Sequence, residues 1–307
     1  MLQIGLIIAG LLLLLIQQFL HPFSDDSQIK FFLVGVLVLG VPHGAADLLV
    51  AIQNAGSRKI AFSKVRFFIN YLGRLIIFGF ILWLFPIVGI ILFILFAAYH
   101  FGETDLHHFK TDLFSGKVMV TAYGLVILSV LLLSHLEEVK PIVNYIDSGS
   151  QVSSLFLQLE SHRIPIIFSS LFFLSTVLFY YLYKNKIVLT KKDAVYLGRF
   201  ICILFILYRM PLVLGFTFYF ILWHSLLSMN NIIEYLRKDR LNKPIIILKQ
   251  ILGYSSLAIA GIFLVGLAGL MFLNSNAFLS YIFMGLAVLT APHMQIMHDM
   301  YNKIRSA

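Results

Sequence analysis

The chain has 307 residues, of which 60% are hydrophobic and 12% are charged, and its apolar residues fall in blocks too long for the helices of a soluble core. The formal net charge is +9, but the basic residues lie in short loops between the apolar blocks, which is typical of a membrane protein and excludes a compact nucleic-acid-binding domain. The one cysteine, Cys202, lies inside an apolar block and excludes an intramolecular disulfide.

The apolar blocks predict an all-α fold, a polytopic membrane helical bundle of about ten transmembrane helices that forms one integral-membrane domain, 1-307. The predicted spans are 2-20, 30-51, 63-84, 87-106, 117-134, 164-183, 193-209, 211-235, 246-273 and 277-301. Two of the boundaries between neighbouring spans are inferred, because the runs 65-101 and 193-236 are each too long for one crossing of a roughly 30 Å hydrocarbon core. Pro86 and Pro211 stand near the centres of these runs, where a hairpin can turn.

The basic residues predict how the chain lies in the membrane. Most of the 23 lysines and arginines follow the even-numbered spans, while Arg74 and Arg199 lie within spans. By the positive-inside rule we expect the N-terminus outside, the C-terminus in the cytoplasm, and a multi-pass protein of the cell inner (plasma) membrane.

Four of the even-numbered spans carry a histidine near the same depth. His43, His100, His224 and His293 follow the starts of their apolar runs by 12, 13, 13 and 15 residues, which places them roughly 18–23 Å along helices that run in the same direction. Ionisable side chains inside a membrane are costly and usually face a cavity or a partner. A lone intramembrane histidine more often bonds a neighbouring helix, but four at one depth favour a shared metal centre.

Carboxylates follow two of these histidines. Asp47 comes four residues after His43, and Glu103 and Asp105 come three and five residues after His100. Histidines that bind a metal usually donate their second ring nitrogen to a carboxylate or carbonyl, so we expect these three side chains to orient the ligands and offset the charge of the metal. His298 is at most a weak reserve ligand, because it lies about 140° around the helix from His293.

The pattern excludes two familiar kinds of metal site. No histidine pair has the four-residue spacing of a membrane di-iron desaturase, and the His-Glu-x-x-His motif of zinc proteases is absent. Three or four histidines in an apolar cavity with an open position suit ferrous iron that binds dioxygen.

The sequence also contains a weak internal repeat. Tyr71-Leu-Gly-Arg74 recurs as Tyr196-Leu-Gly-Arg199, and each copy is followed twelve residues later by Pro86 or Pro211 and then by His100 or His224. Spans 3-4 and 7-8 are therefore candidates for related hairpins, with chance similarity of two apolar hairpins as the alternative.

Four motifs together resemble the Brp/Blh family of membrane-bound β-carotene 15,15′-dioxygenases. They are Pro42-His-Gly-Ala-Ala-Asp47, Tyr99-His-Phe-Gly-Glu-Thr-Asp-Leu106, Trp223-His224-Ser225 and Pro292-His-Met294. The resemblance implies cleavage of the central double bond of β-carotene by non-haem Fe(2+) and O2, with retinal as the product and a microbial rhodopsin as a possible user of it. It also implies His43, His100 and His224 as iron ligands.

The chain departs from the family pattern at one position. The pattern has a second histidine four residues after the Trp-His motif, where this chain has Ser228. Serine is a poor iron ligand, so either His293 completes the centre, or three histidines and water do, or the chemistry differs. We therefore expect iron held by His43, His100, His224 and His293 beside a carotenoid that reaches the site from the lipid bilayer.

Two other classes of function stay open on the sequence alone. In a transporter or channel, the histidine layer would relay protons or pass a divalent cation, although no acidic or histidine ladder continues to the other side. In a non-catalytic carotenoid-binding or retinal-binding protein, Ser228 would mark the loss of iron. Metal content separates an enzyme from a binding protein, and ion flux identifies a transporter.

Overall fold

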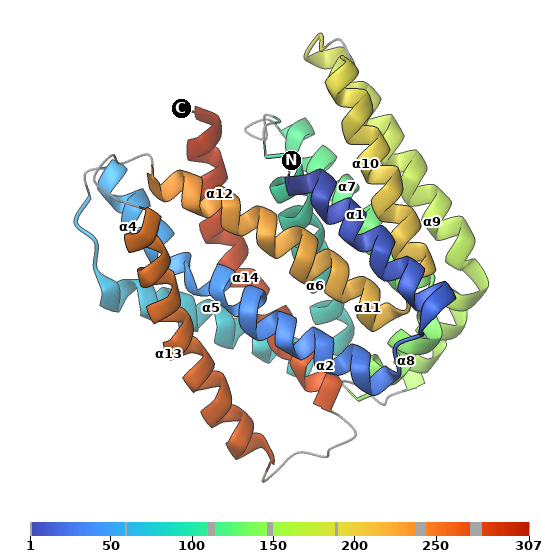
Figure 1. Ribbon diagram of the computed structural model, residues 1–307, viewed down its shortest axis with the longest axis horizontal. Coiled ribbons are helices and arrows are strands. Elements are labelled where there is room, and N and C mark those ends of the chain that lie inside the picture. Colours follow the sequence, from blue (N-terminus) through green and yellow to red (C-terminus); the bar gives the residue numbers. More distant parts are fainter. Residues whose placement is uncertain are drawn as a thin grey trace.

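The computed structural model describes residues 2–58, 60–107, 109, 114–145, 150–187, 190–237, 244–270 and 278–306. Every regular element in these ranges is a helix (Figure 1). The first half of the chain holds α1 (Leu2–Leu15), η1 (Ile16–Leu20), α2 (Asp25–Gly35), η2 (Val36–Gly40), α3 (Val41–Ala45), α4 (Asp47–Ser57), α5 (Lys64–Leu84), α6 (Pro86–Asp105), α7 (Phe114–Leu133) and α8 (Leu136–Asn144). The second half holds α9 (Ser150–Lys184), α10 (Lys191–Arg209), α11 (Leu212–Phe216), η3 (Thr217–Ser225), α12 (Leu226–Arg237), α13 (Pro244–Leu270) and α14 (Phe278–Ser306).

Within the described ranges, nine helical stretches are long and apolar enough to cross a membrane. The predicted polytopic helical bundle is therefore confirmed. The seventh predicted span, 193-209, is not among these nine. It forms α10, which packs against α1 and α7 but carries Lys191, Lys192, Asp193, Arg199 and Arg209. Four of these charges lie at its two ends and Arg199 lies near its middle, which makes α10 less apolar than the other nine.

Both proline hairpins form where the sequence predicts them. Helix α5 ends at Leu84 and α6 begins at Pro86, and α10 ends at Arg209 just before Pro211 and α11. Proline suits the start of a helix because the first amide groups need no partner within the helix. Each long apolar run is thus divided into two helices near its proline, with contacts between α5 and α6 and between α10 and α11.

The predicted position of the N-terminus is not compatible with this arrangement. The start of α1 and the end of α14 point to the same side of the bundle (Figure 1). Ten helices that cross alternately return the chain to the side from which it started, so an outside N-terminus does not fit with a cytoplasmic C-terminus. If the basic loops mark the cytoplasmic side, both termini lie there.

Two of the histidine helices contain π-helical segments. In the first, η2 directly precedes the Pro42-His43 pair, and the Val41 amide donates to the Val36 carbonyl five residues back. Proline provides no amide hydrogen and crowds the preceding turn, which disturbs the regular ladder. In the second, η3 carries His224, and the Ser225 hydroxyl donates to the Phe220 carbonyl, 2.8 Å away and also five residues back. Such wide turns are frequent at functional sites.

Helix α7 packs closely against α6 and α9. The contact with α6 depends on glycine, since a β-carbon on Gly102 would overlap the carbonyl oxygen of Val120, and one on Gly124 would overlap that of Ala98. Small residues let membrane helices approach closely. This packing fixes α6, and with it His100, against the core.

Candidate metal centre

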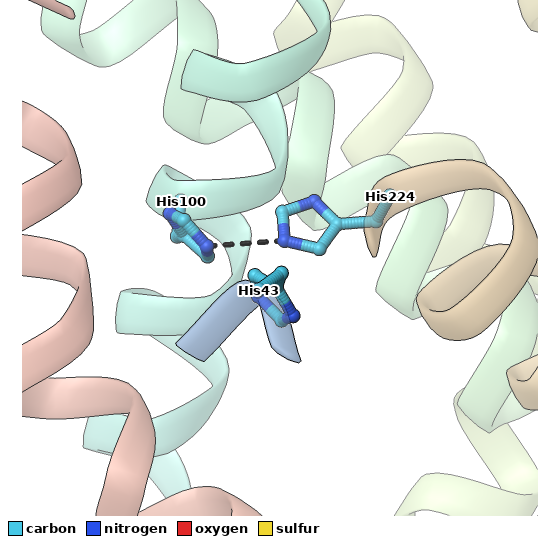
Figure 2. Close-up of side chains that lie close together, drawn as sticks. All are labelled: His43, His100 and His224. Atoms are coloured by element: carbon cyan, nitrogen blue, oxygen red, sulfur yellow. Dashed lines mark hydrogen bonds between the residues drawn. The ribbon is translucent and has the colours of Figure 1, made fainter. Parts of the chain in front are cut away.

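Four buried imidazoles meet in the interior of the bundle. His43 comes from α3, His100 from α6, His224 from η3 and His293 from α14, and each is at most 7% exposed. Figure 2 shows the first three with their rings turned toward one another. The structure therefore brings together all four histidines that the sequence placed at one depth.

The ring nitrogens lie close enough to share one ion. His43, His100 and His224 each offer one nitrogen, and these three atoms lie within 4.8 Å of one another. The Nε2 atoms of His100 and His224 are 3.0 Å apart (Figure 2). Two nitrogens that bind an ion at about 2.1 Å and at right angles are separated by about 3.0 Å, so this spacing suits a pair of ligands as well as a hydrogen bond.

His293 extends the cluster. Its ring centroid lies 4.8 Å from that of His43 and 4.8 Å from that of His100. Its Nδ1 lies 2.7 Å from Oδ1 of Asp47, and Oδ2 of Asp47 accepts a hydrogen bond of 3.1 Å from Tyr71. With Nδ1 donating to the carboxylate, the lone pair of Nε2 is free to face a ligand.

Several nitrogens of the cluster lack a partner. Within the described part of the chain, no well-formed hydrogen bond reaches either nitrogen of His43, Nδ1 of His100, Nδ1 of His224 or Nε2 of His293. Buried polar atoms are normally paired, and an unpaired group points to an unseen ion or water. The residues present therefore fit a bound metal ion.

Asp47 does not contact His43, the histidine that precedes it by four residues. Asp47 lies beyond the interruption of the helix at Ala46, between α3 and α4, yet it faces His293 as His43 does, whose ring centroid is 4.8 Å from that of His293. Its carboxylate instead orients His293, 246 residues away in sequence.

Glu103 joins α6 to α14 instead of bonding to His100. Its Oε1 lies 3.1 Å from the Tyr99 hydroxyl, 2.8 Å from Nδ1 of His298 and 2.9 Å from Arg305. Nε2 of His298 lies 2.9 Å from the side-chain amide nitrogen, Nδ2, of Asn302. His298, the weak reserve ligand of the sequence analysis, is thus part of a hydrogen-bonded network outside the cluster.

Asp105 holds Trp223, the residue that directly precedes His224. Its carboxylate accepts hydrogen bonds of 3.0 and 3.1 Å from Nε1 of Trp223, and further bonds from the Tyr219 and Tyr123 hydroxyls at 3.2 and 3.1 Å. Trp223 directly precedes His224 in η3. Asp105 therefore positions the backbone that carries a histidine, without touching an imidazole.

Aromatic rings close the site, and none of them is among the site residues that the sequence predicts. The Phe220 ring is nearly parallel to that of His224 at 6.0 Å, and the Phe101 centroid lies 4.8 Å from it. Phe101 follows His100 directly and Phe220 precedes His224 by four residues, so their spacing from the histidines is a signal that could have found them. Apolar walls of this kind exclude water and suit an apolar ligand.

Ser228, the position at which the chain departs from the family pattern, is fully buried one turn after His224. It lies beside Tyr301 of α14, whose hydroxyl is 3.3 Å from Oγ1 of Thr104 and 3.3 Å from the amide nitrogen of Asn231. A small polar side chain therefore occupies the place where the pattern has a further ring.

Comparison with known proteins identifies the chain. A family model described as beta-carotene 15,15′-dioxygenase matches residues 34–301. Neither the curated proteins nor the solved structures provide a match. The match spans most of the chain and includes all four histidine motifs, so this protein is a carotenoid-cleaving enzyme that belongs to the beta-carotene 15,15′-dioxygenase family.

Proposed function

We propose that the chain binds ferrous iron with His43, His100, His224 and His293 and cleaves the central double bond of β-carotene with O2 to give two molecules of retinal. The observation that carries the proposal is the meeting of four buried imidazoles with unpaired nitrogens in a chain of this family. Neutral imidazoles without a carboxylate ligand suit ferrous iron with open positions. Iron, when bound, would supply the activation of O2 that a closed-shell polyene needs.

The residues of the chain then have three tasks: to hold the iron, to keep its ligands in place and to exclude water. The four imidazoles hold the ion, and Asp47 keeps His293 in the tautomer that directs Nε2 to it. The rings of Phe101 and Phe220 exclude water and offer flat surfaces to a polyene. Fixing one double bond against the centre determines which bond is cut, because a small displacement along the chain presents a different one.

The reaction itself needs no net proton transfer. Each carbon of the cleaved double bond gains one oxygen atom of O2 and becomes an aldehyde. A site without a free general acid or base is therefore sufficient, which agrees with the engagement of Asp47, Glu103 and Asp105 by other side chains. We further propose that the enzyme works in the cell inner membrane, where its retinal is available to a rhodopsin.

The test is retinal formation in a bacterial host that makes β-carotene, measured by chromatography beside the iron content of the purified protein. We expect retinal and about one iron per chain, and loss of both in His100→Ala, because each ligand contributes directly to metal binding. His21→Ala is the matched control, since His21 is exposed and remote from the cluster.

Other outcomes would identify the alternatives. Abundant, inserted protein that holds iron but leaves β-carotene intact contradicts cleavage of this substrate. Protein that binds the carotenoid without iron would be a binding protein.

A further inference from the structure

A second polar site lies beside the metal centre. A cavity of about 320 Å³ opens between α4, α5 and α14, and Arg58 and Arg74 line it together with Asn70 and Gln295. Phe67 contributes an apolar wall, one of several side chains that do so. The cavity therefore combines permanent positive charge and amide donors with an apolar surface.

Arg74 lies at an unusual place for a charge. It is ten residues after the start of α5, which is about 15 Å along the helix and near the middle of a membrane-spanning segment. Its side chain is exposed, and it makes neither an ion pair nor a hydrogen bond with any described residue. A guanidinium is always charged, and a charge at this depth is stable only beside an anion or when it reaches the interface.

Arg199 of α10 occupies the position in the second Tyr-Leu-Gly-Arg motif that Arg74 occupies in the first, and it has partners within the chain. Arg199 donates to Oε1 of Gln3, and its guanidinium carbon lies 5.2 Å from the centroid of the Tyr196 ring. The fold thus gives Arg199 partners within the chain, whereas Arg74, at the matching position of the Tyr-Leu-Gly-Arg motif, lines the cavity.

The charges around the cavity favour an anion. Arg58, at the end of α4, is likewise exposed and forms no ion pair in the described ranges. Lys303 lies near Arg58 and donates to the Asn54 carbonyl at 2.6 Å. Asp299 also lines the cavity but is not within 4.0 Å of either guanidinium. The cavity and its rim therefore carry three positive charges and one negative charge.

We propose that this cavity binds the phosphate of an anionic phospholipid, with Arg58 and Arg74 as its principal donors. Guanidinium groups bind phosphate through paired hydrogen bonds, and basic pockets between helices on the cytoplasmic side recognise anionic head groups. The acyl chains would follow the lipid-facing side of α5, where Leu72 and Ile76 are exposed. A lipid, in contrast to a free anion, supplies the negative charge and the apolar contact together.

The experiment measures the binding of defined lipids to the delipidated protein in a mild detergent. Phosphatidylglycerol, phosphatidylcholine with the same acyl chains, and inorganic phosphate are titrated separately, and bound ligand is counted by native mass spectrometry with the thermal midpoint followed in parallel. Wild type is compared with Arg58→Gln/Arg74→Gln. The matched control is Lys64→Gln/Arg66→Gln, which removes the same charge from exposed residues at the start of α5, the helix of Arg74, that do not line the cavity.

We expect wild type and control to bind phosphatidylglycerol and to gain thermal stability from it, while the cavity variant binds roughly tenfold or more weakly, because two charge-assisted contacts are lost. Equal binding by the cavity variant and the control would overturn the proposal. The assignment to an anionic lipid would be overturned if inorganic phosphate raised the thermal midpoint at the same concentrations as phosphatidylglycerol. It would also be overturned if phosphatidylcholine bound as tightly as phosphatidylglycerol. If the double variant fails to insert, Arg74→Lys tests the same point, since it keeps the charge and loses the paired donors.

Discussion

The two hairpins that share the Tyr-Leu-Gly-Arg motif reach the same result by different means. In α5–α6 the histidine stands on a regular helix that glycine holds tightly against α7. In α10–α11 and η3 the histidine stands on a π-helical segment that the bonds from Trp223 and Tyr219 to Asp105 hold in place. The repeat therefore supplies two imidazoles whose Nε2 atoms meet at 3.0 Å, while close packing anchors the first and hydrogen bonds anchor the second.

Among the tests of this contrast between the two hairpins, substitution of His100 or His224 should have the largest effect. We expect His100→Ala and His224→Ala to lose bound iron and retinal formation by more than the roughly 10- to 100-fold that the loss of an outer-shell partner costs. The double variant should be no worse than either single one, because groups that act as a unit are not additive. Iron content and retinal yield, compared at equal amounts of inserted protein, check this; a single variant that keeps its iron would show that the hairpins are not equivalent.

Much of this arrangement is readable from local sequence. Apolar block length and Pro86 and Pro211 were enough to place both hairpins, because hydropathy and the missing proline amide act within a few residues. Similar distances from the starts of the apolar runs predicted that His43, His100, His224 and His293 meet, and the structure brings their rings together.

Local sequence does not predict which side chains bind the carboxylates of Asp47 and Glu103. Spacing on one helix suggests that Asp47 supports His43 and Glu103 supports His100. In the structure, His293 of α14 binds the Asp47 carboxylate, and His298 and Arg305 of the same helix bind that of Glu103. Such pairings depend on helix packing between distant parts of the chain, for which a single sequence carries no local signal.

Asp47→Asn distinguishes His293 from the hairpin histidines. Nδ1 of His293 is bound to Asp47, whereas Nδ1 of His100 and of His224 has no such partner in the described structure. We therefore expect iron affinity to fall about 10- to 100-fold, since outer-shell partners of this kind typically contribute that much. Competition with a chelator of known affinity measures it, with Asp26→Asn, an exposed carboxylate at the start of α2, as the control. Unchanged affinity would remove His293 from the ligand set.

The glycine contact tests how the first hairpin is anchored. A β-carbon at Gly102 would overlap the Val120 carbonyl oxygen, whereas one at Gly73 of α5 has no atom within 4 Å. Because the backbone cannot move aside as a side chain can, Gly102→Ala should cost about 1–3 kcal/mol or more of stability. Gly73→Ala should be neutral or slightly stabilising, since alanine favours a helix. Thermal unfolding in detergent separates the two, and equal midpoints would mean that α6 and α7 can separate at no cost.

The smallest effect concerns Arg199, the arginine of the second hairpin that has partners within the chain. Gln3→Ala removes the α1 side chain that accepts from Arg199, and we expect a loss of about 0.5–1.5 kcal/mol, the usual net worth of one hydrogen bond. The contact with the Tyr196 ring would still hold the guanidinium, which keeps the loss small. A double-mutant cycle with Arg199→Gln isolates the pair: if Gln3→Ala costs as much in the Arg199→Gln background as in wild type, the two side chains do not interact. In that case the Tyr196 ring alone would hold the guanidinium of Arg199, and the contrast with Arg74 would rest on that one contact.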